Sequence, residues 1–233
     1  MIYLILLFLT FLFGCSAKWE VGEGRTRVYM GSGIFGTVSL QPEVKPLHDL
    51  KFDKVVRQHY DYSCGSAAVA TVTNYYLGLE FDEATVINML FKVGNPEKIM
   101  KRKGFSLLDI KRLFETLGYR ALGVKTTIET LAKVRKPAIV TIVIGNYKHY
   151  VVFRGVYEGR VVVSDPAFGT AVLPVHEFEK MWYKNIALII DHTDIEETDL
   201  AVSEKELLIV KKDEINRNLI NYSLPVYRTD KDF

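Results

Sequence analysis

The sequence contains very little cysteine: Cys15 and Cys64 are the only two among 233 residues. If Cys15 is removed or lipidated, Cys64 is the one remaining thiol and no intramolecular disulfide can form. A lone free thiol in an oxidising compartment is a liability unless its reactivity is used. The shortage of cysteine therefore favours a catalytic role for Cys64, and it predicts sensitivity to oxidation.

The sequence also lacks a large excess of positive or negative charge. The 30 basic and 28 acidic side chains leave a net charge of +2, too small to attract nucleic acid. The sequence has neither a Lys/Arg cluster interleaved with aromatics nor a Gly-rich phosphate loop. Nucleic-acid partners are therefore set aside, and we expect no metal or other cofactor. The length and the 48% hydrophobic content are sufficient for a folded core.

The chain opens with an apolar run over residues 2–13 that no Lys or Arg precedes. This run is shorter than the roughly 20 residues that span a bilayer, and it fits the apolar part of an export signal. Leu12-Phe13-Gly14-Cys15 resembles the lipobox of bacterial lipoproteins, whereas Cys15-Ser16-Ala17 fits an ordinary cleavage site. An uncleaved anchor is the third alternative. We expect export to the bacterial periplasm or cell envelope, with lipidation of Cys15 favoured over simple cleavage.

Composition divides the chain into four parts. Residues 1–17 are the expected export signal, residues 18–54 an N-terminal extension, residues 55–191 the main domain and residues 192–233 a C-terminal extension. In the first extension, glycines interrupt strand-like pieces at residues 26–30 and 37–40. The second alternates charges with short apolar pieces, and it could add structure or bind a partner.

A segment rich in polar and aromatic residues leads to Cys64-Gly65, and the small residues that follow predict a helix that ends near Gly78. The helix N-terminus would favour a thiolate on Cys64. Gly65 removes a side chain beside the sulfur, and Gln58 offers an amide for an oxyanion hole. Alternatively, Cys64 is a small buried hydrophobe.

His149 is the histidine best placed to serve as a base. It begins an apolar strand that follows a strand at residues 138–144. A hairpin with Glu158-Gly159 at its tip then returns Asp165 to a position opposite Phe153 or Val152, within a few residues of His149. Asp165 could then fix the imidazole tautomer. The alternatives are a core histidine and an Asp-Pro turn, and His59 is a rival base.

The rest of the main domain predicts helices followed by an antiparallel sheet. Asp82 and Ser106 are expected to cap two helices, and residues 98–104 are interpreted as a basic loop between them. Strands and short helices fill residues 119–190. This order indicates an α+β fold with segregated layers.

These motifs resemble the bacteriocin-processing, double-glycine leader peptidases, which are papain-like cysteine peptidases. The resemblance covers roughly residues 55–190 and rests on Gln58, Cys64-Gly65 with Ala67 or Ala68, Tyr75-Tyr76-x-Gly78, His149 and Asp165-Pro166. It implies a papain-like fold, with helices packed on an antiparallel sheet. It also implies that Cys64 is the nucleophile, His149 the general base and acid, Asp165 its orienting partner and Gln58 an oxyanion-hole donor. We expect substrate contacts from Gly65, Tyr62 and Tyr150.

The expected activity is cleavage of a leader or precursor peptide after Gly-Gly through a Cys64 acyl-enzyme. The resemblance implies a peptide substrate whose leader helix docks on an apolar groove, and an exporter as a further partner. A membrane is expected only through the signal or a lipid. Two alternatives stay open: a catalytically silent module that binds a peptide or an exporter, and a hydrolase of cell-wall peptide.

Overall fold

The computed structural model describes residues 16–22, 25–32, 36–40, 47–191, 202 and 206–207. The chain divides into two compact units, Met1–Asp49 and Leu50–Phe233. Residues 1–15 of the predicted export signal, Cys15 included, lie outside the described residues, whereas its last two residues begin β1. Most of the predicted C-terminal extension also lies outside the described residues. Within the described residues, no helix combines the length and the apolar character needed to cross a membrane.

The first unit holds a small antiparallel sheet of three strands in the order β1-β2-β3. Its strands are β1 (Ser16–Gly22), β2 (Arg25–Ser32) and β3 (Gly36–Leu40). Ser16 pairs with Gly31, and Val28 pairs with Leu40. The strand-like pieces predicted at residues 26–30 and 37–40 are therefore confirmed as parts of β2 and β3.

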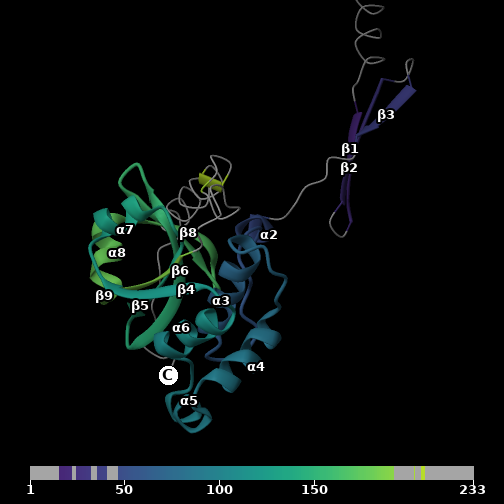
Figure 1. Cartoon of the computed structure of the whole chain (residues 1–233). Coiled ribbons are helices and arrows are strands. Elements are labelled where there is room, and N and C mark those ends of the chain that lie inside the picture. Colours follow the sequence, from purple (N-terminus) through teal and green to yellow (C-terminus); the bar gives the residue numbers. More distant parts are fainter. Residues whose placement is uncertain are drawn as a thin grey trace, which may run out of the picture. The chain divides into compact units, whose positions relative to one another are not determined.

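The second unit combines helices with a six-stranded antiparallel sheet in the order β4-β9-β5-β6-β7-β8 (Figure 1). Its helices are α2 (Leu47–Lys51), α3 (Cys64–Tyr75), α4 (Glu83–Val93), α5 (Pro96–Arg102), α6 (Leu107–Thr116), α7 (Ile128–Val134) and α8 (Val175–Met181). Its strands are β4 (Arg120–Lys125), β5 (Ala138–Ile144), β6 (Tyr147–Tyr157), β7 (Arg160–Asp165), β8 (Gly169–Pro174) and β9 (Trp182–Asp191). The α+β prediction is confirmed.

The sheet carries a hydrophobic core on each face. On one face, α3, α4 and α6 pack against sheet residues that include Ile139 and Val152. On the other, α7 and α8 cover a second core that includes Val140, Val151 and Phe153 (Figure 1). Alternate residues of β6 thus point to opposite faces, as the period of two in a strand requires. Trp182 belongs to this second core, and Met181 packs against it.

Helix α3 is buried along most of its length, because its first turns carry only small side chains. All residues from Cys64 to Thr73 are buried, and the helix packs against β6 and α4. Thr71 anchors the preceding segment, since its hydroxyl accepts the backbone N–H of Val56 at 3.0 Å. The thinness of the helix therefore allows its N-terminus to sit deep in the domain.

The basic loop predicted over residues 98–104 is wrong for most of its length, because α5 occupies Pro96–Arg102. The side chain of Asn95 caps this helix by accepting the Lys98 N–H, and Pro96 occupies its first turn. Buried Ile99 holds the helix against the domain. The run of Lys and Arg lies at the helix C-terminus, where cations are favourable.

The register between β6 and β7 differs from the predicted one because β6 contains a bulge. Val152 pairs with Ser164 and Phe153 with Val163, but Gly155 pairs with Val162, so Arg154 is an extra residue. This register places Asp165 opposite Val151, not opposite Phe153 or Val152 as predicted.

The bulge decides which face of the sheet Asp165 occupies. Directly opposed residues of antiparallel strands share a face, and Val151 lies on the same face as His149, two residues away. Uninterrupted pairing from the Glu158-Gly159 tip would have set Asp165 opposite Val152, on the α3 face. The one-residue shift turns Asp165 to the side of His149.

The turn after Asp165 requires glycine at position 169. Gly169 has a φ of +80°, and a Cβ there would lie 2.7 Å from the Lys51 carbonyl oxygen. We expect Gly169→Ala to lower the free energy of unfolding by about 2–4 kcal/mol, from left-handed strain and overpacking together. Urea denaturation measures the loss.

Gly159→Ala is the matched control, because Gly159 has a φ of +72° but open space around its Cβ position. Only the strain of about 1–2 kcal/mol should appear there. Equal losses in the two variants would contradict a role for the Lys51 contact.

Candidate active site

Cys64 is the first residue of α3, and only 4% of it is exposed. No side chain caps the helix: the hydroxyl of Ser63 donates instead to the Tyr60 carbonyl oxygen at 2.6 Å. The first turn also carries no acidic residue. The sulfur therefore lies at a helix N-terminus whose partial positive charge no carboxylate of that turn offsets.

His149 lies on β6 opposite Ile142 and is 3% exposed. Its Nε2 atom is 2.7 Å from Oδ1 of Asp165, which is 5% exposed. The same oxygen accepts the backbone N–H groups of Ala167 at 2.8 Å and Phe168 at 3.3 Å. The carboxylate is thus fixed by its own turn and holds the imidazole by one nitrogen. Nδ1 is left as the ring nitrogen that can serve the thiol.

Electrostatic coupling joins Cys64 to His149. Burial raises the pKa of Cys64, but hydrogen bonds from His149 and the Tyr150 backbone, together with the imidazolium charge, bring the pKa below its usual value. Burial lowers the pKa of His149, but the hydrogen bonds with Asp165 and Cys64 raise it to about 9 overall. Both shifts favour a thiolate–imidazolium pair at neutral pH.

Gln58 lies in the segment that leads to Cys64, and its backbone is tied to the Asp165 turn. Its N–H donates to the Pro166 carbonyl oxygen at 2.9 Å. The side-chain Nε2 makes only a long hydrogen bond of 3.4 Å to Tyr60, and Oε1 is buried without a hydrogen-bond partner. An amide with such poorly satisfied polar atoms can reorient toward a substrate carbonyl.

Gly65 and Tyr150 lie inside the domain. A Cβ on Gly65 would lie 3.2 Å from the Tyr150 ring and 3.5 Å from Ile110. The hydroxyl of Tyr150 donates to the Phe105 carbonyl oxygen at 3.2 Å, and burial raises its pKa to about 12. The structure therefore gives a different reason for this glycine: it admits the Tyr150 ring beneath the start of α3. The ring in turn holds the loop that carries Phe105.

Tyr147 lies next to the sulfur, and Tyr62 lies next to Tyr147. The Tyr147 hydroxyl lies 3.8 Å from Cys64 Sγ. The Tyr147 ring centroid is 6.2 Å from that of His149 and 6.4 Å from that of Tyr62. Tyr62 adopts a left-handed φ of 62° and remains 46% exposed. Sequence reasoning missed Tyr147, although its position two residues before His149 puts it on the same face of β6 and could have revealed it.

His59, the rival base, is held by a different partner. Its ring Nδ1 lies 3.2 Å from Oε2 of Glu83, and the same oxygen accepts its backbone N–H at 2.8 Å. The Glu83 side chain is 3% exposed, whereas that of His59 is 68% exposed. His149 is the histidine whose hydrogen bond and charge act on Cys64.

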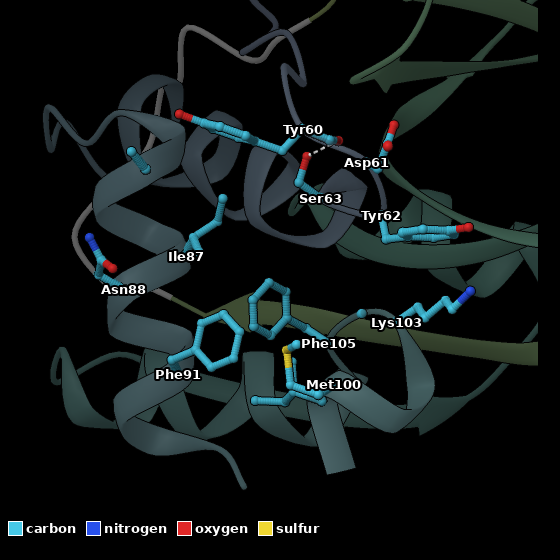
Figure 2. A pocket seen from close by; sticks show the side chains of 13 residues that line it. Tyr60, Asp61, Tyr62, Ser63, Ile87, Asn88, Phe91, Met100, Lys103 and Phe105 are labelled. Atoms are coloured by element: carbon cyan, nitrogen blue, oxygen red, sulfur yellow. Dashed lines mark hydrogen bonds between the residues drawn. The ribbon is translucent and has the colours of Figure 1, made fainter. Parts of the chain in front are cut away.

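An apolar cavity of about 650 Å³ lies between the segment before α3 and helices α4 and α5, and its lining includes Ser63, the residue before Cys64. Ile87, Phe91, Met100 and Phe105 point into it (Figure 2). Tyr62 and Ser63 form the wall next to the sulfur, and Lys103 lies 5.7 Å from the Tyr62 ring. The cavity can therefore take apolar side chains of a ligand that reaches Cys64.

The described residues contain no group of three or more His, Cys, Asp and Glu side chains that could hold a metal ion.

Two curated proteins are similar in sequence to this chain. The "Probable functional amyloid protease FapD" of Pseudomonas aeruginosa is 38% identical over 140 residues, which are 60% of this chain and 62% of that protein. The protein of the same name in Pseudomonas fluorescens is 34% identical over 151 residues, 65% of this chain and 66% of that one. The chain thus covers less than two thirds of the length of each.

Among solved structures, the peptidase domain of Streptococcus ComA, a bifunctional ABC transporter involved in quorum sensing, aligns with a TM-score of 0.50 at 22% identity. The alignment covers 59% of this chain and 96% of that domain, and it supports the fold. The model of the Peptidase C39 family matches residues 53–194, more than half of the chain. The protein therefore belongs to the Peptidase C39 family, which confirms the resemblance to the double-glycine leader peptidases and the papain-like fold.

Proposed function

We propose that this protein is a cysteine endopeptidase that cleaves a leader or precursor peptide after Gly-Gly. The observation that carries the proposal is the buried arrangement of Cys64 at a helix N-terminus with His149 coupled to it and Asp165 fixing the imidazole. A nucleophile, a base and an orienting group in this relation are the requirements for acyl transfer.

The reaction begins with attack of the Cys64 thiolate on the peptide carbonyl carbon. The amide of Gln58 and the backbone N–H of Cys64 stabilise the oxyanion, a kind of contact worth about 3–4 kcal/mol for one donor. His149 gives its proton to the leaving amine, and the C–N bond breaks to leave a thioester. Neutral His149 then activates water, which hydrolyses the thioester and restores the thiol.

Two tyrosines near the sulfur account for the proposed selectivity for glycine. The Tyr147 hydroxyl is 3.8 Å from the sulfur, and the centroid of the Tyr62 ring is 6.4 Å from that of Tyr147. A peptide that passes between them reaches Cys64 most easily when its last two residues lack side chains. The cavity lined by Ile87, Phe91 and Phe105 then accepts apolar side chains of the upstream leader.

The substrate and the location of the reaction belong to the same proposal. The apolar run at residues 2–13 supports export to the periplasm or cell envelope, with a lipid on Cys15 as the favoured form of anchoring. The name of the Pseudomonas relatives supports a substrate from a functional-amyloid system. Association with an exporter is supported by the likeness to a transporter's peptidase domain.

We expect the protein to cut a synthetic leader peptide after Gly-Gly and Cys64→Ala to abolish the cut, because no other group in the site can form the acyl-enzyme. Mass spectrometry of the digest identifies the cleaved bond. A peptide with Ala-Ala at the same position is the control and should remain intact.

Two other results would overturn the proposal in different ways. Binding of the leader peptide by both proteins without cleavage would indicate the silent binding module. Cleavage of a cell-wall peptide, with the leader left intact, would indicate an envelope hydrolase.

Substitution of each candidate histidine should show which one is the catalytic base. We expect His149→Ala to reduce kcat/KM by at least about 10³-fold, since general acid–base catalysis contributes up to about 10⁴-fold. Asp165→Ala should leave measurable activity, because it removes only the orienting group. His59→Ala is the control and should change kcat/KM by less than about threefold, since His59 contacts Glu83. A larger loss in His59→Ala than in His149→Ala would reverse the assignment.

The pH dependence should follow the thiolate–imidazolium pair. Activity should rise as Cys64 loses its proton, below the usual thiol pKa, and fall near pH 9 as His149 loses its own. Tyr147→Phe removes one of the hydrogen bonds that lower the Cys64 pKa, so the acid limb should move to higher pH. The rate of Cys64 alkylation by iodoacetamide against pH, followed by peptide mass, measures the shift.

Tyr157→Phe is the matched control, since Tyr157 is an equally exposed tyrosine at the far end of β6. Its alkylation profile should coincide with that of the unaltered protein. An unchanged acid limb in Tyr147→Phe would mean that the tyrosine hydroxyl does not act on the thiolate.

A further inference from the structure

The bulge that directs Asp165 toward His149 contains a buried charge. Arg154, the extra residue in β6, has a side chain with 0% exposure. Its Nη1 donates to Oε1 of Glu206 at 2.7 Å, and its Nη2 donates to Oε2 at 3.1 Å. The Glu206 side chain is 8% exposed. The bulged strand is therefore joined by a bidentate ion pair to a residue 52 positions later in the chain.

This partner comes from outside the family domain. The family match ends at residue 194, and Glu206 lies in the predicted C-terminal extension. A guanidinium cannot lose its proton in a protein, so a buried arginine needs a carboxylate or equivalent acceptors. The planar, two-fold contact also fixes the direction of the arginine side chain and thus of the strand that carries it.

We propose that Glu206 is a positioning residue for the catalytic pair: by holding Arg154 inside the protein it maintains the bulge that brings Asp165 to the face of His149. The inference rests on the proposed function only in assigning a catalytic task to His149 and Asp165. Glu206 is then an intramolecular brace of the peptidase domain.

The strand register explains why loss of the Arg154–Glu206 ion pair would change the position of Asp165. Without the Glu206 carboxylate, the buried guanidinium loses its bidentate ion pair, which lowers the cost of regular pairing in β6 at the expense of the bulge. Uninterrupted pairing puts Asp165 opposite Val152, on the sheet face away from His149. Glu206 would thus act on the site through the strand, with no contact to the substrate.

The test is Glu206→Gln in the full chain, which keeps the shape of the side chain and removes its charge. We expect kcat to fall by roughly 2- to 30-fold, the range for residues that act on a site at a distance, with KM nearly unchanged. The pKa of His149, measured by NMR titration, should be lower in this variant, because the hydrogen bond with Asp165 raises it. In an Asp165→Ala background the same substitution should have no further effect on kcat.

Glu115→Gln is the matched control, since it breaks an ion pair with Lys111 on the exposed face of α6. Neither kcat nor the His149 titration should change there. If Glu206→Gln does not fold, Glu206→Asp carries the test, because it keeps the charge but not the bidentate fit. A folded variant with the original kcat and His149 titration would overturn the proposal. The titration needs no substrate, so it reports on the brace even if Gly-Gly peptides are not cleaved.

Discussion

The hydrogen bond between His149 Nε2 and Asp165 Oδ1 is the contact on which the rest of the site depends. It is buried, and the carboxylate is fixed by two backbone N–H groups of its own turn. A histidine held by one nitrogen has its other nitrogen directed and its tautomer determined. The coupling of the imidazole to Cys64 follows from that restraint, as does the displacement of both pKa values in opposite directions.

Sheet geometry makes this hydrogen bond possible. Side chains that meet across two antiparallel strands must share a face, and the single extra residue Arg154 determines which face Asp165 takes. The bulge at Arg154, five residues after His149 in the same strand, therefore affects the geometry of the site. The ion pair with Glu206 extends this dependence to the C-terminal segment.

The surroundings of the Cys64 sulfur are formed by elements that lie far apart in the sequence. Cys64 is the first residue of α3, Tyr147 begins β6 after the β5–β6 turn, and the segment before α3 carries Gln58 and Tyr62. The hydrogen bond from the Gln58 backbone to Pro166 ties that segment to the Asp165 turn. This backbone contact links the predicted oxyanion-hole donor to the turn of the carboxylate that holds His149.

The sequence by itself determined the local features of this protein. Small residues after Cys64 indicated a buried helix, apolar runs indicated the central strands, and Asp82 and Ser106 indicated helix starts that the structure confirms. Cys64, His149 and Asp165 could be chosen because their residue types and their flanking patterns are local signals. The family followed from the same motifs.

Only the tertiary structure decided the contacts that depend on register and packing. The bulge at Arg154 and the filling of the space at Gly65 by Tyr150 have no local signature. The interpretation of residues 98–104 as a loop failed because burial of Ile99 and capping by Asn95 outweighed the run of charges. Such features arise from the balance of pairing, burial and charge among distant segments, which a pattern along one chain does not contain.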